Sequence, residues 1–260
     1  GIDYLSATIH SGSHAGYYPD ALQMSIKITF SPADGKLLGA QIVGYSGVDK
    51  RIDEFSQVIK HNGTVYDLMA LEQAYAPPFS SAKDPVAVTG YVAGNILNGK
   101  MQPLYWRELQ VADWSKVTLV DVRTPDEFAL GALKGAVNIP LDDMRDRMKE
   151  IPRDKPVYLY CGVGLRGYLA SNILLQNGYQ EVKNLIGGLK LYKAATTPLP
   201  EPKEFSNSGS SSSDSSKVDH SEHSKDSAEA YTIASSVIPS MRAIKVDACG
   251  ISCPGPIMKL

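Results

Sequence analysis

Residues 157–178, VYLYCGVGLRGYLASNILLQNG, decide the fold of the middle of the chain. Val157–Tyr160 is a short apolar run, which predicts a buried β-strand. Gly167–Asn177 has the composition of a helix, and Gly178 follows as its closing residue. The glycine-rich loop between the two begins with Cys161. A strand, a glycine-rich loop and a helix in this order are typical of an α/β unit with a parallel sheet.

The same alternation extends over residues 101–198. The expected strands are Val117–Val122, Ala136–Ile139, Val157–Tyr160 and Val182–Leu185, and the expected helices are Pro125–Leu130, Asp142–Glu150, Gly167–Asn177 and Gly188–Ala194. We therefore predict an α/β domain whose parallel sheet is covered by helices on both faces.

Residues 1–100 have a different pattern. Met24–Phe30 alternates apolar and polar residues, and Leu37–Val43 follows after a turn, so the two predict a hairpin. Val48–His61 has helical spacing, and Pro85 begins a second helix. Strands followed by helices predict an α+β domain.

The remainder of the chain divides into two segments. Residues 199–240 are rich in serine and poor in apolar side chains, so we predict a disordered linker. We interpret His220 and His223 in this linker as solvated side chains, and we predict no metal site. Residues 241–260 become apolar again and predict the start of a truncated third domain. Both ends of the chain suggest a fragment of a longer protein.

The overall composition excludes several classes of partner. The chain has 26 basic and 28 acidic residues, so it offers no broad positive field for nucleic acid or for an anionic membrane. No apolar run is long enough to span a bilayer. Only three cysteines are present, which disfavours a disulfide framework. We therefore expect a cytoplasmic protein with reduced thiols that serve chemistry.

Cys161 has the surroundings of a reactive thiolate. It lies at the carboxyl end of a predicted parallel strand, where α/β folds place their ligands. The loop glycines allow the following amide groups to turn inward as an anion-binding nest, and Arg166 adds a cation. Residues 101–198 contain no histidine. This disfavours a cysteine protease or acyltransferase and favours attack of sulfur on sulfur, which needs no proton relay.

Three ordered motifs resemble a single-domain rhodanese. They are Asp121-Val-Arg-Thr-Pro-Asp-Glu-Phe128, Gly131-Ala-Leu-Lys-Gly-Ala-Val-Asn-Ile-Pro140 and the Cys161 loop. The resemblance implies that Cys161 accepts a sulfane sulfur from thiosulfate or a polysulfide and passes it to a thiol or cyanide. The family often has a histidine where this chain has Ala132.

The resemblance also implies roles for neighbouring residues. Arg166 is expected to contact the anion. The amides of the loop are expected to hold the persulfide, and these belong to Gly162, Val163, Gly164, Leu165 and Gly167. Asp121, Arg123 and Glu127 are expected to form an ion network that orients the loops.

Two other readings of the Cys161 loop are disfavoured. A cysteine phosphatase needs five residues between its cysteine and arginine, whereas four separate Cys161 from Arg166, so the loop is too small for phosphate. Residues 162–167 also fit the G-x-G-x-x-G pattern of dinucleotide-binding proteins. However, no acidic residue closes the following strand, Val182–Leu185.

Three segments of residues 1–100 resemble the dimerisation domain of FAD-dependent pyridine nucleotide–disulfide oxidoreductases of the coenzyme A-disulfide reductase type. They are His14-Ala-Gly-Tyr-Tyr-Pro19, Gly39-Ala-Gln-Ile-Val-Gly44 and Tyr75-Ala-Pro-Pro-Phe-Ser-Ser-Ala-Lys-Asp-Pro85. The resemblance implies a homodimer in which Tyr17 and Tyr75 reach the flavin site of the partner and contact the substrate sulfur. FAD and NAD(P)H are implied for the longer parent, and we expect neither to bind this chain alone.

The last fourteen residues resemble the opening of a TusA/SirA-like sulfur-carrier domain. They read Asp247-Ala-Cys-Gly-Ile-Ser-Cys-Pro-Gly-Pro-Ile-Met-Lys-Leu260. The resemblance implies that Cys253 carries sulfur, and that Cys249 either resolves its persulfide or pairs with it as a disulfide.

Together, the three resemblances predict a sulfurtransferase domain fused to a flavoprotein disulfide or persulfide reductase. The expected partners are small sulfur donors and thiol acceptors, among them coenzyme A persulfide. The alternative is a non-catalytic module that carries or senses a persulfide.

Overall fold

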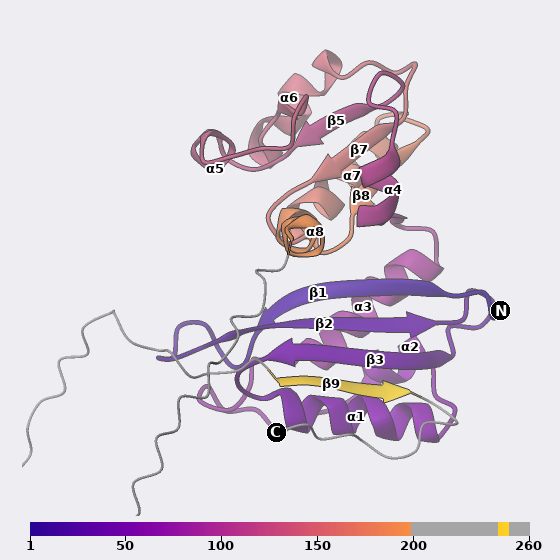
Figure 1. Ribbon diagram of the computed structural model, residues 1–260, viewed down its shortest axis with the longest axis vertical. Coiled ribbons are helices and arrows are strands. Elements are labelled where there is room, and N and C mark those ends of the chain that lie inside the picture. The colour runs from indigo at the N-terminus through magenta and orange to yellow at the C-terminus, as the bar shows by residue number, and fades with distance from the viewer. Residues whose placement is uncertain (199–243, 250–260) are drawn as a thin grey trace, which may run out of the picture. The chain divides into compact units, whose positions relative to one another are not determined.

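The computed structural model describes residues 1–198 and, as backbone only, residues 244–249 (Figure 1). Within these ranges no helix is long and apolar enough to cross a membrane. The predicted linker, His220, His223 and Cys253 lie outside the described residues.

The first domain is an antiparallel sheet with helices packed against it (Figure 1). Its strands are β1 (Leu5–Gly12), β2 (Gln23–Phe30), β3 (Leu37–Gly44) and β9 (Ile244–Cys249), in that order across the sheet. Its helices are α1 (Val48–Lys60), α2 (Val65–Ala70) and α3 (Pro85–Leu97). The predicted hairpin and the two predicted helices are all present. Asp84 caps α3 through its side chain, which accepts from the amide of Val86.

Residues 244–249, which the sequence predicts to open a third domain, form the strand β9. It runs antiparallel to β3, with Ile244 opposite Gly44 and Cys249 opposite Gly39. The outer strand of a sheet presents unpaired amide and carbonyl groups, and a further strand satisfies them. This pairing makes β9 the edge strand of the first sheet.

The second domain contains the predicted parallel sheet. Its five strands lie in the order β4 (Gln102–Leu104), β8 (Val182–Leu185), β7 (Val157–Tyr160), β5 (Thr118–Asp121) and β6 (Val137–Asn138), and every pair is parallel. The α-helices are α4 (Trp106–Val111), α5 (Pro125–Ala129), α6 (Met144–Arg147), α7 (Leu165–Gln176) and α8 (Gly188–Thr196). Tyr160, the last residue of β7, is fully buried. The carboxyl end of this strand therefore lies in the interior of the domain.

The structure differs from the sequence-based prediction in detail. The segment predicted as one helix over Asp142–Glu150 is α6 flanked by two 3₁₀ turns, η1 (Leu141–Asp143) and η2 (Met148–Glu150). Such turns are common at the ends of short α-helices. The helix after the Cys161 loop begins at Leu165 rather than Gly167, which places Arg166 in its first turn.

Candidate active site

Cys161 directly follows β7, which lies between β8 and β5 in the parallel sheet. The residue is 1% exposed and packs on the apolar core of the domain. The amide of Gly164 donates a hydrogen bond to its Sγ atom at 3.1 Å. The backbone therefore presents a hydrogen-bond donor to this sulfur.

Two carbonyl groups of the loop accept hydrogen bonds from backbone amides in the first turn of α8. The amide of Leu189 donates to the carbonyl of Cys161 at 2.8 Å, and the amide of Lys190 donates to that of Gly162 at 3.0 Å. In a trans peptide the carbonyl and the following N–H point in opposite directions. The N–H groups of Gly162 and Val163 therefore point away from α8.

Several amides of the loop are free to bind an anion. In the part of the chain that the structure describes, no protein acceptor faces the amides of Gly162, Val163, Leu165, Arg166 and Gly167. The last three belong to the first turn of α7, where helix amides lack partners within the helix. Free amides at a helix start are a favourable environment for negative charge.

Two glycines allow α8 to approach the loop. Gly187 and Gly188 have positive φ angles of 70° and 58°. A side-chain carbon at Gly188 would lie 2.6 Å from the carbonyl oxygen of Cys161, closer than any real contact. Only glycine therefore permits this packing. The pair was not among the predicted site residues, although two adjacent glycines one residue after the predicted strand Val182–Leu185 were an available signal.

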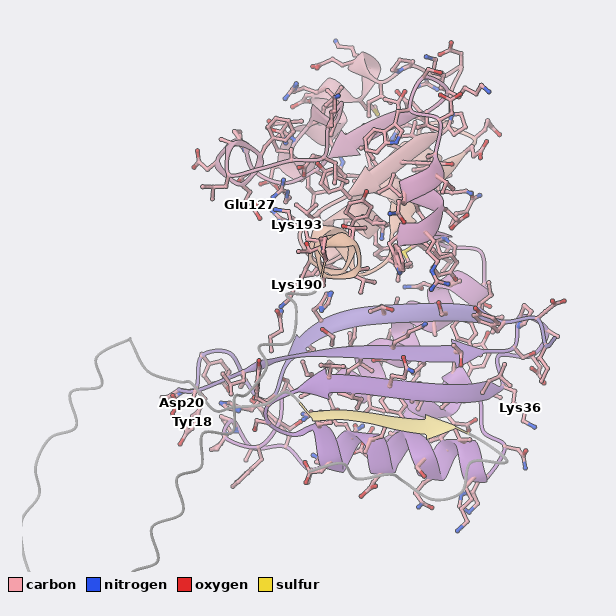
Figure 2. The ribbon with its side chains drawn as sticks, viewed as in Figure 1. Tyr18, Asp20, Lys36, Glu127, Lys190 and Lys193 are labelled. Atoms are coloured by element: carbon pink, nitrogen blue, oxygen red, sulfur yellow. The ribbon has the colours of Figure 1, made fainter. Side chains whose placement is uncertain are left out.

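Arg166 and Glu127 form a bidentate ion pair beside Cys161. Their N–O distances are 2.6 and 2.7 Å, and their side chains are 34% and 38% exposed. The guanidinium lowers the pKa of Glu127 to about 2, and the carboxylate together with Cys161 raises the pKa of Arg166. Figure 2 shows Glu127 on the same side of the domain as Lys193 of α8.

Asp121 and Arg123 form a second ion pair, which is buried. The Arg123 guanidinium contacts Asp121 at 2.6 Å and also donates to the carbonyl of Gly131 at 2.9 Å. The Asn138 amide donates to the carbonyls of both Asp121 and Arg123. This network joins the end of β5 to the 131–140 segment. The sequence grouped Glu127 with these residues, whereas the structure pairs it with the arginine of the cysteine loop.

In the first domain, Tyr17 and Tyr75 lie together. Their hydroxyl oxygens are 2.8 Å apart, and the residues are 77% and 47% exposed. The hydrogen bond with Tyr17 raises the pKa of the Tyr75 phenol. The two residues that the sequence selected from distant segments thus form one exposed pair.

A buried ion pair connects the segment that leads into the Tyr17 loop with the residue that ends the Tyr75 loop. The Arg51 guanidinium donates to Asp84 at 2.9 and 3.1 Å and to the carbonyl of Ser13 at 2.9 Å. Ser13 precedes the Tyr17 loop, and Asp84 ends the Tyr75 loop. Arg51 was not predicted as a site residue, because its partners are distant in sequence.

Comparison with known proteins covers both domains. Residues 106–195 match the model of the rhodanese-like domain, and residues 1–86 match that of the pyridine nucleotide-disulphide oxidoreductase dimerisation domain. A sulfurtransferase of Allochromatium vinosum is 41% identical over 93 residues, which are 36% of this chain and 87% of the relative. The chain belongs to the rhodanese-like family. Its rhodanese-like domain follows a dimerisation domain of the oxidoreductase type.

Longer relatives combine these parts. A coenzyme A disulfide reductase of Staphylococcus epidermidis is 43% identical over 92 residues, which are 35% of this chain and 21% of that protein. The crystal structure of reduced Bacillus anthracis CoADR-RHD is 48% identical with a TM-score of 0.72, covering 74% of this chain and 34% of that one. The structure of an NAD-dependent persulfide reductase from A. fulgidus is 36% identical with a TM-score of 0.65, covering 72% and 34%. The chain thus spans about a fifth of the Staphylococcus epidermidis reductase and about a third of each of the two solved chains.

Proposed function

We propose that the rhodanese-like domain transfers sulfane sulfur through a persulfide on Cys161. The thiolate attacks the outer sulfur of a donor such as thiosulfate, and a new S–S bond forms. The S–S bond of the donor breaks, and its electron pair leaves on sulfite. An acceptor thiolate or cyanide then attacks the outer persulfide sulfur, and the Cys161 thiolate is released. Neither step needs a relayed proton, which agrees with a domain that lacks histidine.

The arrangement of the loop peptides carries this proposal. The carbonyls of Cys161 and Gly162 are bound by α8, the amide of Gly164 faces the sulfur, and the neighbouring amides have no protein acceptor among the described residues. A persulfide is an anion at neutral pH, and free amides stabilise it without adding a charge. Arg166 supplies a positive charge at the same loop, which favours anionic donors.

The burial of Cys161 narrows the choice of donor. With 1% of the residue exposed, only a donor with a slim reacting end fits. Thiosulfate has such an end, and so does a persulfide at the tip of a linear arm, as in coenzyme A persulfide. The same burial favours a second candidate function, in which the domain carries a persulfide for a partner without turnover.

For the whole protein, we propose a homodimeric FAD-dependent reductase of coenzyme A disulfide or coenzyme A persulfide. FAD, when bound, would pass electrons from NAD(P)H to the sulfur–sulfur bond. In this chain, residues 1–100 would form the dimer, and Tyr17 and Tyr75 would contact the substrate sulfur near the flavin of the partner. The observation that supports this assignment is that the two phenols are exposed and hydrogen-bonded to each other. Phenols in this arrangement fit a site completed by a second subunit.

We also propose that residues 241–260 carry the opening motif of a TusA/SirA-like carrier domain, although the strand β9 within them pairs with β3 of the first sheet. Cys253 would accept the outer sulfur of the Cys161 persulfide by thiolate attack, and Cys161 would leave as a thiolate. Cys249 would resolve the resulting persulfide by attacking the inner sulfur of Cys253, which releases hydrosulfide and leaves a Cys249–Cys253 disulfide. The motif alone supports this step. Shortening the 199–240 linker should slow the transfer, and an unchanged rate would count against a relay.

The proposed activity is tested by replacing Cys161 with Ser in the full chain. The variant should lose transfer of sulfur from thiosulfate to cyanide, because no thiolate remains at the loop. Cys253→Ser serves as the matched control and should retain this transfer. Activity that persists in Cys161→Ser refutes the proposal. Wild-type protein that gains sulfur but does not turn over supports the carrier function instead.

A further inference from the structure

We propose that Asn184 is a positioning residue for the Cys161 loop. Its side-chain amide holds the carbonyl of Gly164 and thereby orients the amides that receive the persulfide. This inference rests on the proposed sulfur transfer at Cys161 and adds to it a residue that does not touch the sulfur.

Asn184 is a buried polar residue on a central strand of the parallel sheet. It lies on β8, beside β7, and is 2% exposed. Strands buried on both faces of a parallel sheet are normally apolar. The Nδ2 atom donates to the carbonyl oxygen of Gly164 at 3.0 Å. The Oδ1 atom is buried and has no hydrogen-bond partner among the described residues.

An unpaired buried oxygen destabilises a fold, so stability alone does not account for this asparagine. An apolar side chain of similar size would avoid that cost. The orientation of the amide is also defined by its neighbours. Nδ2 faces both the carbonyl of Gly164 and, at 3.3 Å, the sulfur of Met101, and both of these are acceptors. A reversed amide would place Oδ1 against two acceptors.

The carbonyl that Asn184 holds belongs to the peptide that carries the amide of Leu165. It also accepts from the amide of Tyr168 at 3.0 Å, so two donors fix its direction. Because the peptide is trans, the N–H of Leu165 points the opposite way. The N–H of Gly164 itself donates to Sγ of Cys161. Gly164 has a φ of 115°, which residues with a side chain rarely adopt, so glycine is needed at this position.

Gly167 packs directly against the side chain of Asn184. A side-chain carbon at Gly167 would collide with Oδ1 of Asn184 and would lie 3.1 Å from its Cγ atom. The glycine thus leaves the space that the amide occupies. We expect the two positions to be coupled, so that a side chain at residue 167 displaces the amide and loosens Gly164.

The main test compares Asn184→Leu with the parent protein in a Cys249→Ser/Cys253→Ser background, where Cys161 is the only thiol. The pH profile of alkylation by iodoacetamide should move to higher pH, and alkylation at neutral pH should slow about 3- to 10-fold, because one neutral hydrogen bond no longer orients the loop. Sulfur transfer from thiosulfate should slow by a similar factor. The urea midpoint should stay the same or rise. Unchanged profiles and rates would overturn the proposal.

A matched control separates positioning from general damage. Asn172 on α7 also donates through Nδ2, to the carbonyl of Tyr168 at 3.0 Å, but it does not contact the loop carbonyls. Asn172→Leu should leave the alkylation profile and the transfer rate unchanged. If both leucine variants slow alkylation equally, the role assigned to Asn184 is wrong.

A second set of variants covers the case in which Asn184→Leu does not fold. Gly167→Ala alone should slow alkylation, because it displaces the amide, and Asn184→Ala alone should slow it as well. The double variant should be slowed by less than the product of the two factors, because alanine at 184 leaves room for alanine at 167. Strictly multiplicative effects would overturn the coupling.

The alkylation assay does not depend on sulfur transfer. Wild-type protein that transfers no sulfur, while Asn184→Leu still moves the alkylation profile, would refute the proposed function and leave the positioning role intact.

Discussion

Replacing Arg166 by Met removes the cation beside Cys161 and keeps much of the side-chain volume. In the structure the guanidinium makes two charge-assisted hydrogen bonds to Glu127, at 2.6 and 2.7 Å. Both side chains are about a third exposed, so water screens the pair. The variant loses its attraction for an anionic donor and leaves an unpaired carboxylate at the same place.

The size of the effect follows from these contacts. We expect one hydrogen bond from the Arg166 guanidinium to the anionic donor, and such a bond contributes about 1.5–3 kcal/mol, so kcat/KM for thiosulfate should fall about 10- to 100-fold. At high dielectric, two charges about 4 Å apart interact by about 1 kcal/mol. Removing the unpaired carboxylate in Arg166→Met/Glu127→Gln should therefore recover about fivefold. Steady-state kinetics with thiosulfate and cyanide at low salt measure both changes.

The control is an ion pair of the same kind outside the loop. Arg147 and Glu150 are 2.8 Å apart with side chains 39% and 47% exposed. Arg147→Met should leave kcat/KM unchanged. Wild-type activity in Arg166→Met, or an equal loss in Arg147→Met, would refute the reasoning.

Three further predictions concern single side chains. The pKa of Glu127 lies at about 2 instead of its usual 4.5, so its ion pair stabilises the fold fully above about pH 4.5 and loses this effect as the pH falls toward 2. Urea unfolding should show Glu127→Gln to be less stable by at most about 1 kcal/mol near neutral pH and equal to wild type near pH 2, and a constant difference would contradict this. Gly188→Ala should slow sulfur transfer at least about tenfold, because the added carbon collides with the backbone of the cysteine loop. Kinetics with thiosulfate measure the loss, and an unchanged circular dichroism spectrum shows that the variant is folded. Tyr17→Phe should lower the pKa of the Tyr75 phenol toward its usual value, since the hydrogen bond that raises it is lost. Alkaline absorbance titration measures that shift, and an unchanged Tyr75 would show that the pair does not form in solution.

Local sequence patterns were sufficient to predict much of the second domain. The bounds of β7 and β8 agree with the predicted strands. β7 is a continuous run of apolar and aromatic residues, as expected for a strand buried on both faces of a parallel sheet. The sequence indicates Cys161 because a cysteine, a strand end and a glycine-rich loop occur within a few consecutive residues. Tyr17 and Tyr75 came only from a family resemblance, since 58 residues separate them.

The contacts that were missed join distant segments. Glu127 pairs with an arginine 39 residues away, and no local pattern marks that partner. Asn184 follows Lys183 in β8, and two polar residues in a short strand do not indicate by themselves which of them is buried. Gly188 has a role because α8 returns onto the loop after β7, and this return is a property of the tertiary fold. The pairing of β9 with β3 at the edge of the first sheet was also not predicted. Such pairing depends on which strand of the folded sheet has an unpaired edge, and the sequence does not show this.

The central claim is that Cys161 holds the transferred sulfur as a persulfide. The most direct measurement is the mass of the full chain and of its peptides after brief exposure to thiosulfate and removal of excess donor. We predict a gain of about 32 Da, one sulfur atom, on the peptide that contains Cys161, and its loss after addition of cyanide. No added mass on that peptide in the Cys253→Ser protein, which cannot pass the sulfur on to residue 253, would contradict the account.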